Sequence, residues 1–146
     1  MARAKHQILV IPFRKIETNI EYCIMKRSDT SWWQFIAGGG EDQETPFESA
    51  KREAFEEAKI SFNSDYIELE SIASIPAVHF NFIWGDNVFV IPEYTFAVEI
   101  SESIKLSSEH LEYKWVSYNI AREMLEFDSN KNALWELDYK LKSKIV

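Results

Sequence analysis

Apolar residues along the chain gather into short runs separated by polar connections. The runs have the length, the alternation and the content of β-branched and aromatic residues that are typical of strands. Strands are predicted at residues 6–13, 20–26, 66–75, 88–91 and 94–100, and a strand-like alternation also occurs within residues 108–116. Residues 14–19 form a polar connection, and Pro92 marks a bend, a bulge or an edge between two of the strands. Tyr113 and Trp115 alternate along the last run and are expected to point inward.

A helix is predicted at residues 46–58 from signals at its start. Thr45 is a good N-cap, Pro46 suits the first helical position, and Glu48 completes a capping box. At about 100° per residue, one side of this helix is apolar and mostly small, which lets it lie close against a sheet. That side carries Phe47, Ala50, Ala54 and Ala58.

Two more helices are predicted near the C-terminus. A short helix covers residues 117–127, a polar connection follows at 128–130, and a final helix covers residues 130–144. The apolar face of the final helix consists of Leu134, Leu137, Leu141 and Ile145. Strands on both sides of a capped helix, followed by more strands and a closing helix, predict an α/β fold with a mixed sheet between helices. The chain is expected to be a single domain, residues 1–146.

Composition narrows the classes of function. A net charge of −8 argues against a nucleic-acid polymer as a partner, because such binding needs a basic surface. No apolar run approaches the length of a membrane span, and the N-terminus lacks the pattern of a signal peptide, so no membrane partner is expected. Cys23 is the single cysteine and is expected to be a buried thiol, which favours a cytoplasmic location. A homodimer is left open.

Glycines and carboxylates are concentrated just before and within the first helix. Three of the four glycines stand together at residues 38–40, where a loop is expected, and Glu53, Glu56 and Glu57 crowd one side of the predicted helix. Two such charges about 4 Å apart repel by roughly 4 kcal/mol at an effective dielectric near 20. The carboxylates must therefore spread into solvent, with Glu48 and Arg52 as a favourable helical pair, or share a hard cation such as Mg²⁺ or Mn²⁺.

The spacing of these residues resembles the Nudix box, G-x5-E-x7-R-E-U-x-E-E-x-G-U, where U is a bulky aliphatic residue. Seven of its nine specified positions match, from Gly38 through Glu44 to the run that begins at Arg52 and ends at Ile60. Ala54 is smaller than the usual aliphatic residue. Lys59 replaces the glycine that ends the helix, and it is expected to deny the helix its left-handed C-cap.

The resemblance implies an α/β/α sandwich around a mixed sheet and a metal-dependent hydrolase. It implies that Glu53, Glu56 and Glu57 bind a divalent metal, Mg²⁺ with Mn²⁺ as the alternative, and that the carbonyl of Ala37 or Gly38 adds a ligand. Glu53 is a ligand or a base. Arg52 would hold Glu53 in place, and Glu44 would pair with Arg52.

Three further segments are candidates for binding substrate. One of Lys26 and Arg27 is expected to face the substrate phosphates, the resemblance favouring Lys26, although a solvated strand end is the alternative. Trp33, in a Trp-Gln pair that resembles the dihydroneopterin triphosphate and dATP branch of the family, either packs in the core or stacks on a ring. Residues 78–84, with Phe80, either form a wall for that ring or cover the core.

Residues 108–116 resemble the E-H-x-x-Y-x-W segment of many Nudix hydrolases. The resemblance implies that Glu109 approaches the metal from a different loop, as ligand or general base, a role for which Glu112 is the weaker candidate. His110 is either a base or a structural residue.

The resemblance implies hydrolysis of a phosphoanhydride in a nucleoside triphosphate or a related small molecule. Dihydroneopterin triphosphate or dATP is the expected substrate, with pyrophosphate and a monophosphate as products. The alternatives are a hydrolase of dinucleoside polyphosphates or other nucleotide derivatives, and a Nudix-fold module that binds nucleotide without turnover.

Overall fold

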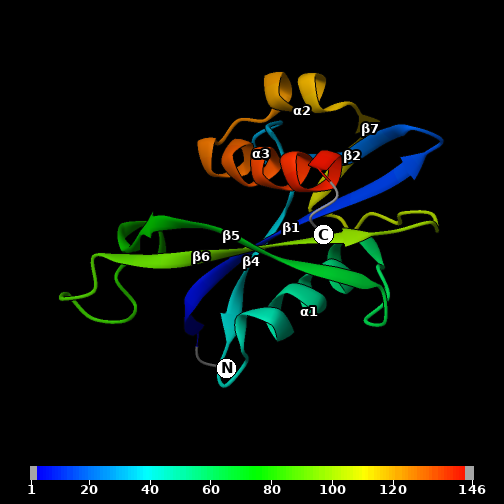
Figure 1. Ribbon diagram of the computed structural model, residues 1–146. Coiled ribbons are helices and arrows are strands. Elements are labelled where there is room, and N and C mark those ends of the chain that lie inside the picture. Colours follow the sequence, from blue (N-terminus) through cyan, green and yellow to red (C-terminus); the bar gives the residue numbers. More distant parts are fainter. Residues whose placement is uncertain (1–2, 144–146) are drawn as a thin grey trace.

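The computed structural model describes residues 3–143, in which strands and helices alternate along the chain (Figure 1). The strands are β1 (Arg3–Ile16), β2 (Asn19–Arg27), β3 (Trp33–Gln34), β4 (Ile36–Glu41), β5 (Asp65–Pro76), β6 (Val90–Glu99) and β7 (His110–Val116). The helices are α1 (Pro46–Ala58), the 3₁₀-helix η1 (Ala77–Phe80), α2 (Tyr118–Met124) and α3 (Asp128–Ser143).

The strands form one mixed sheet in the order β3-β2-β1-β6-β5, in which β4 also pairs with β1 and β7 also pairs with β2. β1 runs parallel to β6, from Gln7 beside Glu93 to Phe13 beside Glu99. The other strand pairs in the described part of the chain are antiparallel. Residues 8–11 of β1 are fully buried, because strands flank them on both edges and helices cover both faces.

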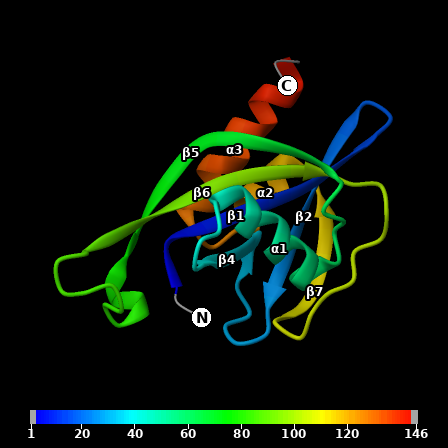
Figure 2. The ribbon, with the colours of Figure 1, turned by 90° about the horizontal axis from the view of Figure 1, so that it is seen from below.

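Helices cover both faces of the sheet, with α1 on one side and α2 and α3 on the other (Figures 1 and 2). The α1 side buries Ala50, Ala54 and Ala58 against alternate residues of β1 such as Ile8. On the opposite face, Leu134 and Leu137 of α3 pack against the intervening residues of β1. This arrangement confirms the predicted α/β/α sandwich.

Helix α1 begins where the sequence predicts. Thr45 Oγ1 accepts a hydrogen bond from the Glu48 N–H at 3.2 Å, and Glu48 Oε1 accepts one from the Thr45 N–H at 2.8 Å. The prediction for its other end is wrong. Lys59 itself takes the left-handed conformation with φ of 58°, and its N–H donates to the Phe55 carbonyl at 2.9 Å. A lysine therefore occupies a backbone conformation that glycine adopts with less strain.

Two expectations for the sheet are corrected. The glycines were expected in a loop, but they belong to β4, where Gly38 and Gly39 pair with Ile8 and Gln7 of β1. The strands expected at 88–91 and 94–100 form the single strand β6, and Pro92 lies within it. Pro92 is tolerated because it precedes Glu93, at which pairing with β1 begins, so this part of β6 pairs with β5 alone.

The remaining differences concern boundaries and side chains. β1 and β2 extend through most of the expected connection and leave a turn at Glu17, which has φ of 58°. β5 shows the predicted irregularity, between Glu68 and Ile72. Helix α2 is shorter than expected, and α3 begins at Asp128, within the expected connection. Tyr113 is exposed rather than inward, whereas Trp115 packs against the core.

Cys23 is buried, as predicted, and burial raises the pKa of its thiol. Ile145, predicted on the apolar face of the last helix, lies outside the described residues. In residues 3–143, no helix has the length and apolar character needed to cross a membrane.

Candidate active site

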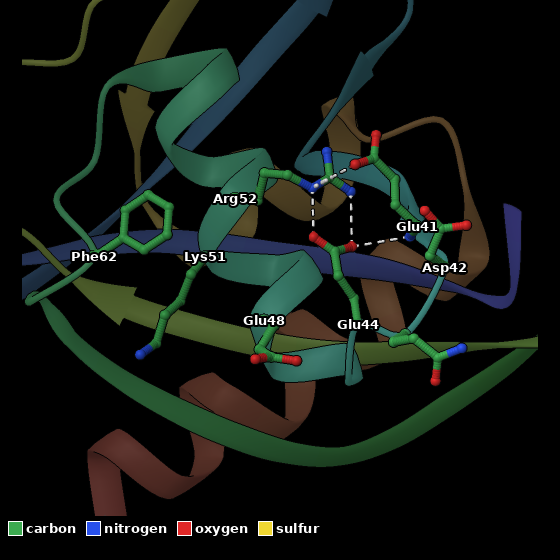
Figure 3. A pocket seen from close by; sticks show the side chains of 8 residues that line it. Glu41, Asp42, Glu44, Glu48, Lys51, Arg52 and Phe62 are labelled. Carbon is green, nitrogen blue, oxygen red and sulfur yellow. Dashed lines mark hydrogen bonds and ion pairs between the residues drawn. The ribbon is translucent and has the colours of Figure 1, made fainter. Parts of the chain in front are cut away.

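Arg52 connects α1 to the strand and loop that precede it. Its Nε donates to Glu44 Oε2 at 2.7 Å (Figure 3), its Nη2 donates to the Gly39 carbonyl at 2.8 Å, and its Nη1 donates to Glu53 Oε1 at 3.0 Å. The Arg52 hydrogen bond lowers the pKa of Glu44 to about 2, which keeps this carboxylate charged. Arg52 and Glu44 thus make the contacts that the resemblance implied.

A chain of contacts that was not predicted from the sequence connects β1 to the carboxylate of Glu44. Ser49 Oγ donates to Glu44 Oε1 at 2.7 Å, and His6 Nε2 lies 3.0 Å from Ser49 Oγ. Burial lowers the pKa of His6, so its ring is held neutral. Nothing local marks either residue, because their contact exists only once α1 packs on β1.

A groove of about 630 Å³ adjoins this network, and Figure 3 shows the side chains that line it. It is lined by Glu41, Asp42, Gln43, Glu44, Glu48, Lys51, Arg52 and Phe62. Its lining lacks Glu53, Glu57 and Glu109, so the groove is separate from the pocket described next.

Close packing of β4 on α1 explains a glycine at position 38. A Cβ atom on Gly38 would lie 2.3 Å from Glu53 Cδ, which is shorter than any tolerated contact. The side chain of Ala37 lies on the opposite face of the sheet, in the core under α3. Of these two residues, Gly38 is therefore the one whose backbone adjoins the box carboxylates.

The box carboxylates meet the segment before β7 in a pocket of about 200 Å³. We call it the carboxylate pocket; it is lined by Glu53, Glu56, Glu57, Ser107, Ser108 and Glu109. Backbone hydrogen bonds fix the segment, from the Ser107 N–H to the Glu57 carbonyl and from the Ser28 N–H to the Glu109 carbonyl, both at 3.0 Å. The structure therefore brings Glu109 to the box helix, as expected.

Glu57 is the most buried carboxylate of the pocket, at 2% exposed, and neither of its oxygens has a hydrogen-bond partner in residues 3–143. Burial, followed by the neighbouring Glu53 and Glu109, raises the pKa of Glu57 well above its usual range. Burial also raises the pKa of Glu53. Glu56 differs, because 55% of its side chain is exposed and it contacts Arg52 at 3.3 Å.

This donor set fits a hard divalent cation. The unpartnered carboxyl group of Glu57 lies in one pocket with Glu53 and Glu109, and carboxylate oxygens are the ligands that Mg²⁺ and Mn²⁺ prefer. The side chains are not preassembled around an ion: in the described part of the chain, no three or more His, Cys, Asp or Glu groups are arranged as a metal centre. Glu53, Glu57, Glu109 and the Gly38 backbone are the groups that could hold one.

His110 lies behind Glu57. Its Nδ1 is 3.5 Å from Glu57 Oε1, and neither ring nitrogen has a hydrogen-bond partner within residues 3–143. Burial and the charge of Arg27 lower the pKa of His110, so the ring is neutral. With 5% of the residue exposed, its position favours the structural interpretation over that of a base.

The predicted phosphate ligands are both engaged with acids. Lys26 Nζ lies 3.9 Å from Glu112 Oε1. Arg27 makes two hydrogen bonds of 2.8 Å to Asp29, and the charges of Glu109 and Glu57 also act on its guanidinium. Arg27 is therefore electrostatically linked to the carboxylate pocket.

The two aromatic candidates lie apart from the carboxylates. Trp33 packs against the core on the α3 side, and Lys114 Nζ lies 5.3 Å from its ring centroid. Phe80 is in η1, where its ring packs against Trp84 at 5.6 Å and beneath the Arg3 guanidinium at 5.0 Å. Neither of them lines the carboxylate pocket.

The fold and this site define the class of protein. A family model described as the NUDIX domain matches residues 6–135. The chain therefore belongs to the Nudix family and is a Nudix hydrolase, an enzyme class that generally uses divalent metals.

Known proteins resemble it along most of its length. It is 31% identical over 140 residues to dihydroneopterin triphosphate diphosphatase from Haemophilus influenzae, covering 92% of this chain and 88% of that one. A Nudix hydrolase structure from Listeria monocytogenes superposes with a TM-score of 0.87 at 46% identity, over 95% of each chain. Dihydroneopterin triphosphate pyrophosphohydrolase from E. coli has a TM-score of 0.76 at 24% identity, over 92% of this chain and 94% of that one.

Proposed function

We propose that this protein hydrolyses a phosphoanhydride in dihydroneopterin triphosphate or a dATP-like nucleoside triphosphate, releasing pyrophosphate and a monophosphate. The observation that carries the proposal is the buried, unpartnered carboxylate of Glu57 beside Glu53 and Glu109. A structural role would leave such a group paired, so its retention supports a site that binds an ion. The Haemophilus relative supports the substrate class.

The residues divide into metal-holding and positioning groups. Glu53, Glu57, Glu109 and the Gly38 carbonyl would hold Mg²⁺, or Mn²⁺ as the alternative, with the exposed Glu56 at the rim. When bound, the ion neutralises phosphate oxygens and lowers the pKa of the attacking water. Arg52 keeps Glu53 directed at β4 through its hydrogen bonds to Glu53 and Gly39.

Glu109 is the group that we assign as general base. Unlike Glu57, it is exposed to solvent, so a water molecule can approach it and lose a proton to it. His110 keeps its position behind Glu57 and supports that carboxylate. Arg27, electrostatically linked to the pocket, would contact the substrate phosphates after it leaves Asp29.

The test is product release from a panel that contains dihydroneopterin triphosphate, dATP, the other deoxynucleoside triphosphates and a dinucleoside polyphosphate. We expect pyrophosphate and a monophosphate from the pterin or adenine compound, and no release when EDTA removes the metal. Hydrolysis in water labelled with heavy oxygen identifies the attacked phosphorus from the labelled product. Tight binding of these compounds without any release would refute the proposal and favour a binding module.

A further inference from the structure

A second buried carboxylate lies on the other face of the sheet, outside the carboxylate pocket. Glu93 of β6 is 7% exposed, and its Oε1 has no hydrogen-bond partner in residues 3–143. Its strand neighbours are Gln7 of β1 and Ala73 of β5. Burial raises the pKa of Glu93, and Ser129, in the first turn of α3, acts in the opposite direction. The hydrolytic site does not use Glu93.

The alternation along β6 places Glu93 on the α3 face. Phe96 and Val98 pack toward α1, whereas Ala97 packs toward α3, and Glu93 has the same parity as Ala97. Arg3 and Phe80 belong to the same face. A Cβ on Gly39 would meet the Arg3 guanidinium at 2.3 Å, while Cβ atoms on its two neighbours would point to α1.

Glu93 lies two strands away from the glycine segment of β4. Gln7 pairs with Gly39 on one side and with Glu93 on the other, so the three residues form one row across β4, β1 and β6. Two strand spacings separate Gly39 from Glu93, which is about 10 Å. Gly39 adjoins Gly38, whose backbone lies beside Glu53, so the phosphates of a ring bound at Glu93 would have to pass the edge of β4 to reach the carboxylate pocket.

Packing alone does not account for the carboxyl group of Glu93. Thr95, two residues along the same face, donates its hydroxyl to the Ser71 carbonyl at 2.6 Å, so a polar side chain here can be satisfied by the protein. A buried donor or acceptor without a partner destabilises the fold, and more so if it is charged. Burial raises the pKa of Glu93 to about 7, so the ionised form remains accessible near neutral pH.

Gln7, the strand neighbour of Glu93, connects to further polar and aromatic groups. With its amide oriented to satisfy both ends, Gln7 donates to the Gly38 carbonyl at 3.1 Å and accepts from Arg3 Nη2 at 2.7 Å. Arg3 in turn lies over the Phe80 ring. Gln7 thus has a partner at both its amide nitrogen and its amide oxygen, whereas Glu93 Oε1 has no hydrogen-bond partner in residues 3–143.

We propose that Glu93 selects the ring of the substrate by accepting two hydrogen bonds from a 2-amino-4-oxopyrimidine edge, as found in pterins and guanine. This proposal rests on the proposed function and specifies its substrate class. The edge presents a ring N–H beside an exocyclic amino group, two parallel donors that match the two oxygens of a carboxylate. Adenine presents one donor and one acceptor there, so it satisfies an ionised carboxylate only in part.

The experiment combines one change in the protein with one change in the substrate. kcat and KM are measured with Mg²⁺ for dihydroneopterin triphosphate, dGTP, dATP and dITP, whose ring lacks the 2-amino group. The variants are Glu93→Gln and the matched control Glu99→Gln. Glu99 lies on the same face of β6 as Glu93, at the other end of the strand, and 40% of its side chain is exposed.

In the wild type we expect kcat/KM for dGTP to exceed that for dITP by about tenfold, the discrimination of a good paired contact. Glu93→Gln should lower kcat/KM for the pterin and dGTP by about tenfold, mainly through KM, and leave dITP nearly unchanged. The preference for dGTP over dITP then disappears. Glu99→Gln should keep the wild-type ratio.

Several results would overturn the assignment. An equal loss on all substrates, or a larger loss on dATP than on dGTP and the pterin, contradicts this role for Glu93. If the variant does not fold, a wild-type dGTP to dITP ratio near one is enough to reject it. Failure of the proposed function is a different result, because the wild type would then hydrolyse none of the four compounds.

Discussion

The helices on the two faces of the sheet each bury a glutamate, and the two glutamates differ in their hydrogen bonding. On α3, Glu136 Oε1 accepts hydrogen bonds from the N–H and the hydroxyl of Ser71, and Oε2 accepts from the Glu70 N–H and from Lys140 Nζ, all at 2.6 to 2.8 Å. On α1, Glu57 has no hydrogen-bond partner in the described part of the chain. The same residue type is thus satisfied on one helix and left unsatisfied on the other.

The pKa values of these two carboxyl groups move in opposite directions. Burial alone would raise the pKa of Glu136, but the hydrogen bonds from Lys140, Ser71 and the backbone lower it to about 2. Burial raises the pKa of Glu57, and the adjoining Glu53 and Glu109 raise it further. Glu136 therefore connects α3 to β5 and contributes to folding, whereas Glu57, the carboxylate that we propose binds the cation, is buried at a cost to folding.

The largest effect should come from Glu57→Gln. Removing the main metal-holding carboxylate should lower kcat/KM by at least about 10². The metal-free variant should melt no lower than the wild type, since an unpartnered buried carboxyl is replaced by a neutral isostere. Steady-state kinetics and thermal unfolding in EDTA measure the two effects. A near-normal rate would show that Glu57 does not hold the ion.

Glu109→Gln tests the exposed carboxylate of the same pocket. We expect kcat to fall by roughly 10², with a smaller change in KM, because a general base acts in the transition state. Since Glu109 is exposed, the melting temperature should not change. A rise in KM with kcat intact would make Glu109 a binding group and leave the base to Glu53.

Glu136→Gln is the reciprocal test on α3. The folded-state pKa of about 2 lies below the usual value of 4.5, so this carboxylate stabilises the fold above about pH 5 and the contribution disappears as the pH falls toward 2. Denaturant unfolding at pH 7 should show a loss of about 2–3 kcal/mol, with kcat unchanged for the folded enzyme. A difference that persists at pH 2 would contradict the ionic origin of this stabilisation.

Much of α1 and its surroundings could be predicted from sequence because the signals there are local. Thr45, Pro46 and Glu48 fix the start of the helix by short-range hydrogen bonds. The contacts of Arg52 with Glu44 and Glu53 were expected from the resemblance to the Nudix box. The position of the glycines could not be predicted in this way, since glycine is a poor strand former. The glycines within β4 are explained by tertiary contacts, because Glu53, Arg3 and His6 lie where Cβ atoms on residues 38, 39 and 40 would stand.

Glu93 could not be found from the sequence for a different reason. Glu93 and Glu99 have the same parity in one strand, and nothing in the local sequence shows which of them is buried. The difference arises from tertiary packing, because α3 begins beside Glu93 while Glu99 stands at a solvated strand end. The contact from His6 through Ser49 to Glu44 likewise depends on elements that are distant in the sequence.

The smallest effect concerns the end of α1, two residues beyond Glu57. Lys59 holds a left-handed conformation that costs a non-glycine residue about 1–2 kcal/mol, partly offset by the contact of its ammonium group with the Phe55 ring at 4.9 Å. Lys59→Gly should therefore raise the free energy of unfolding by roughly 0.5–1 kcal/mol, measured in denaturant. Lys59→Ala, which keeps the strain and loses the ring contact, is the matched control and should destabilise slightly. Turnover should stay the same in both, because Lys59 lines neither the carboxylate pocket nor the surface at Glu93. A lower kcat in the glycine variant would mean that the strained end of α1 helps to position Glu57. The folding stability that α1 loses for the sake of the site would then include the strained backbone of Lys59 as well as the buried carboxylates.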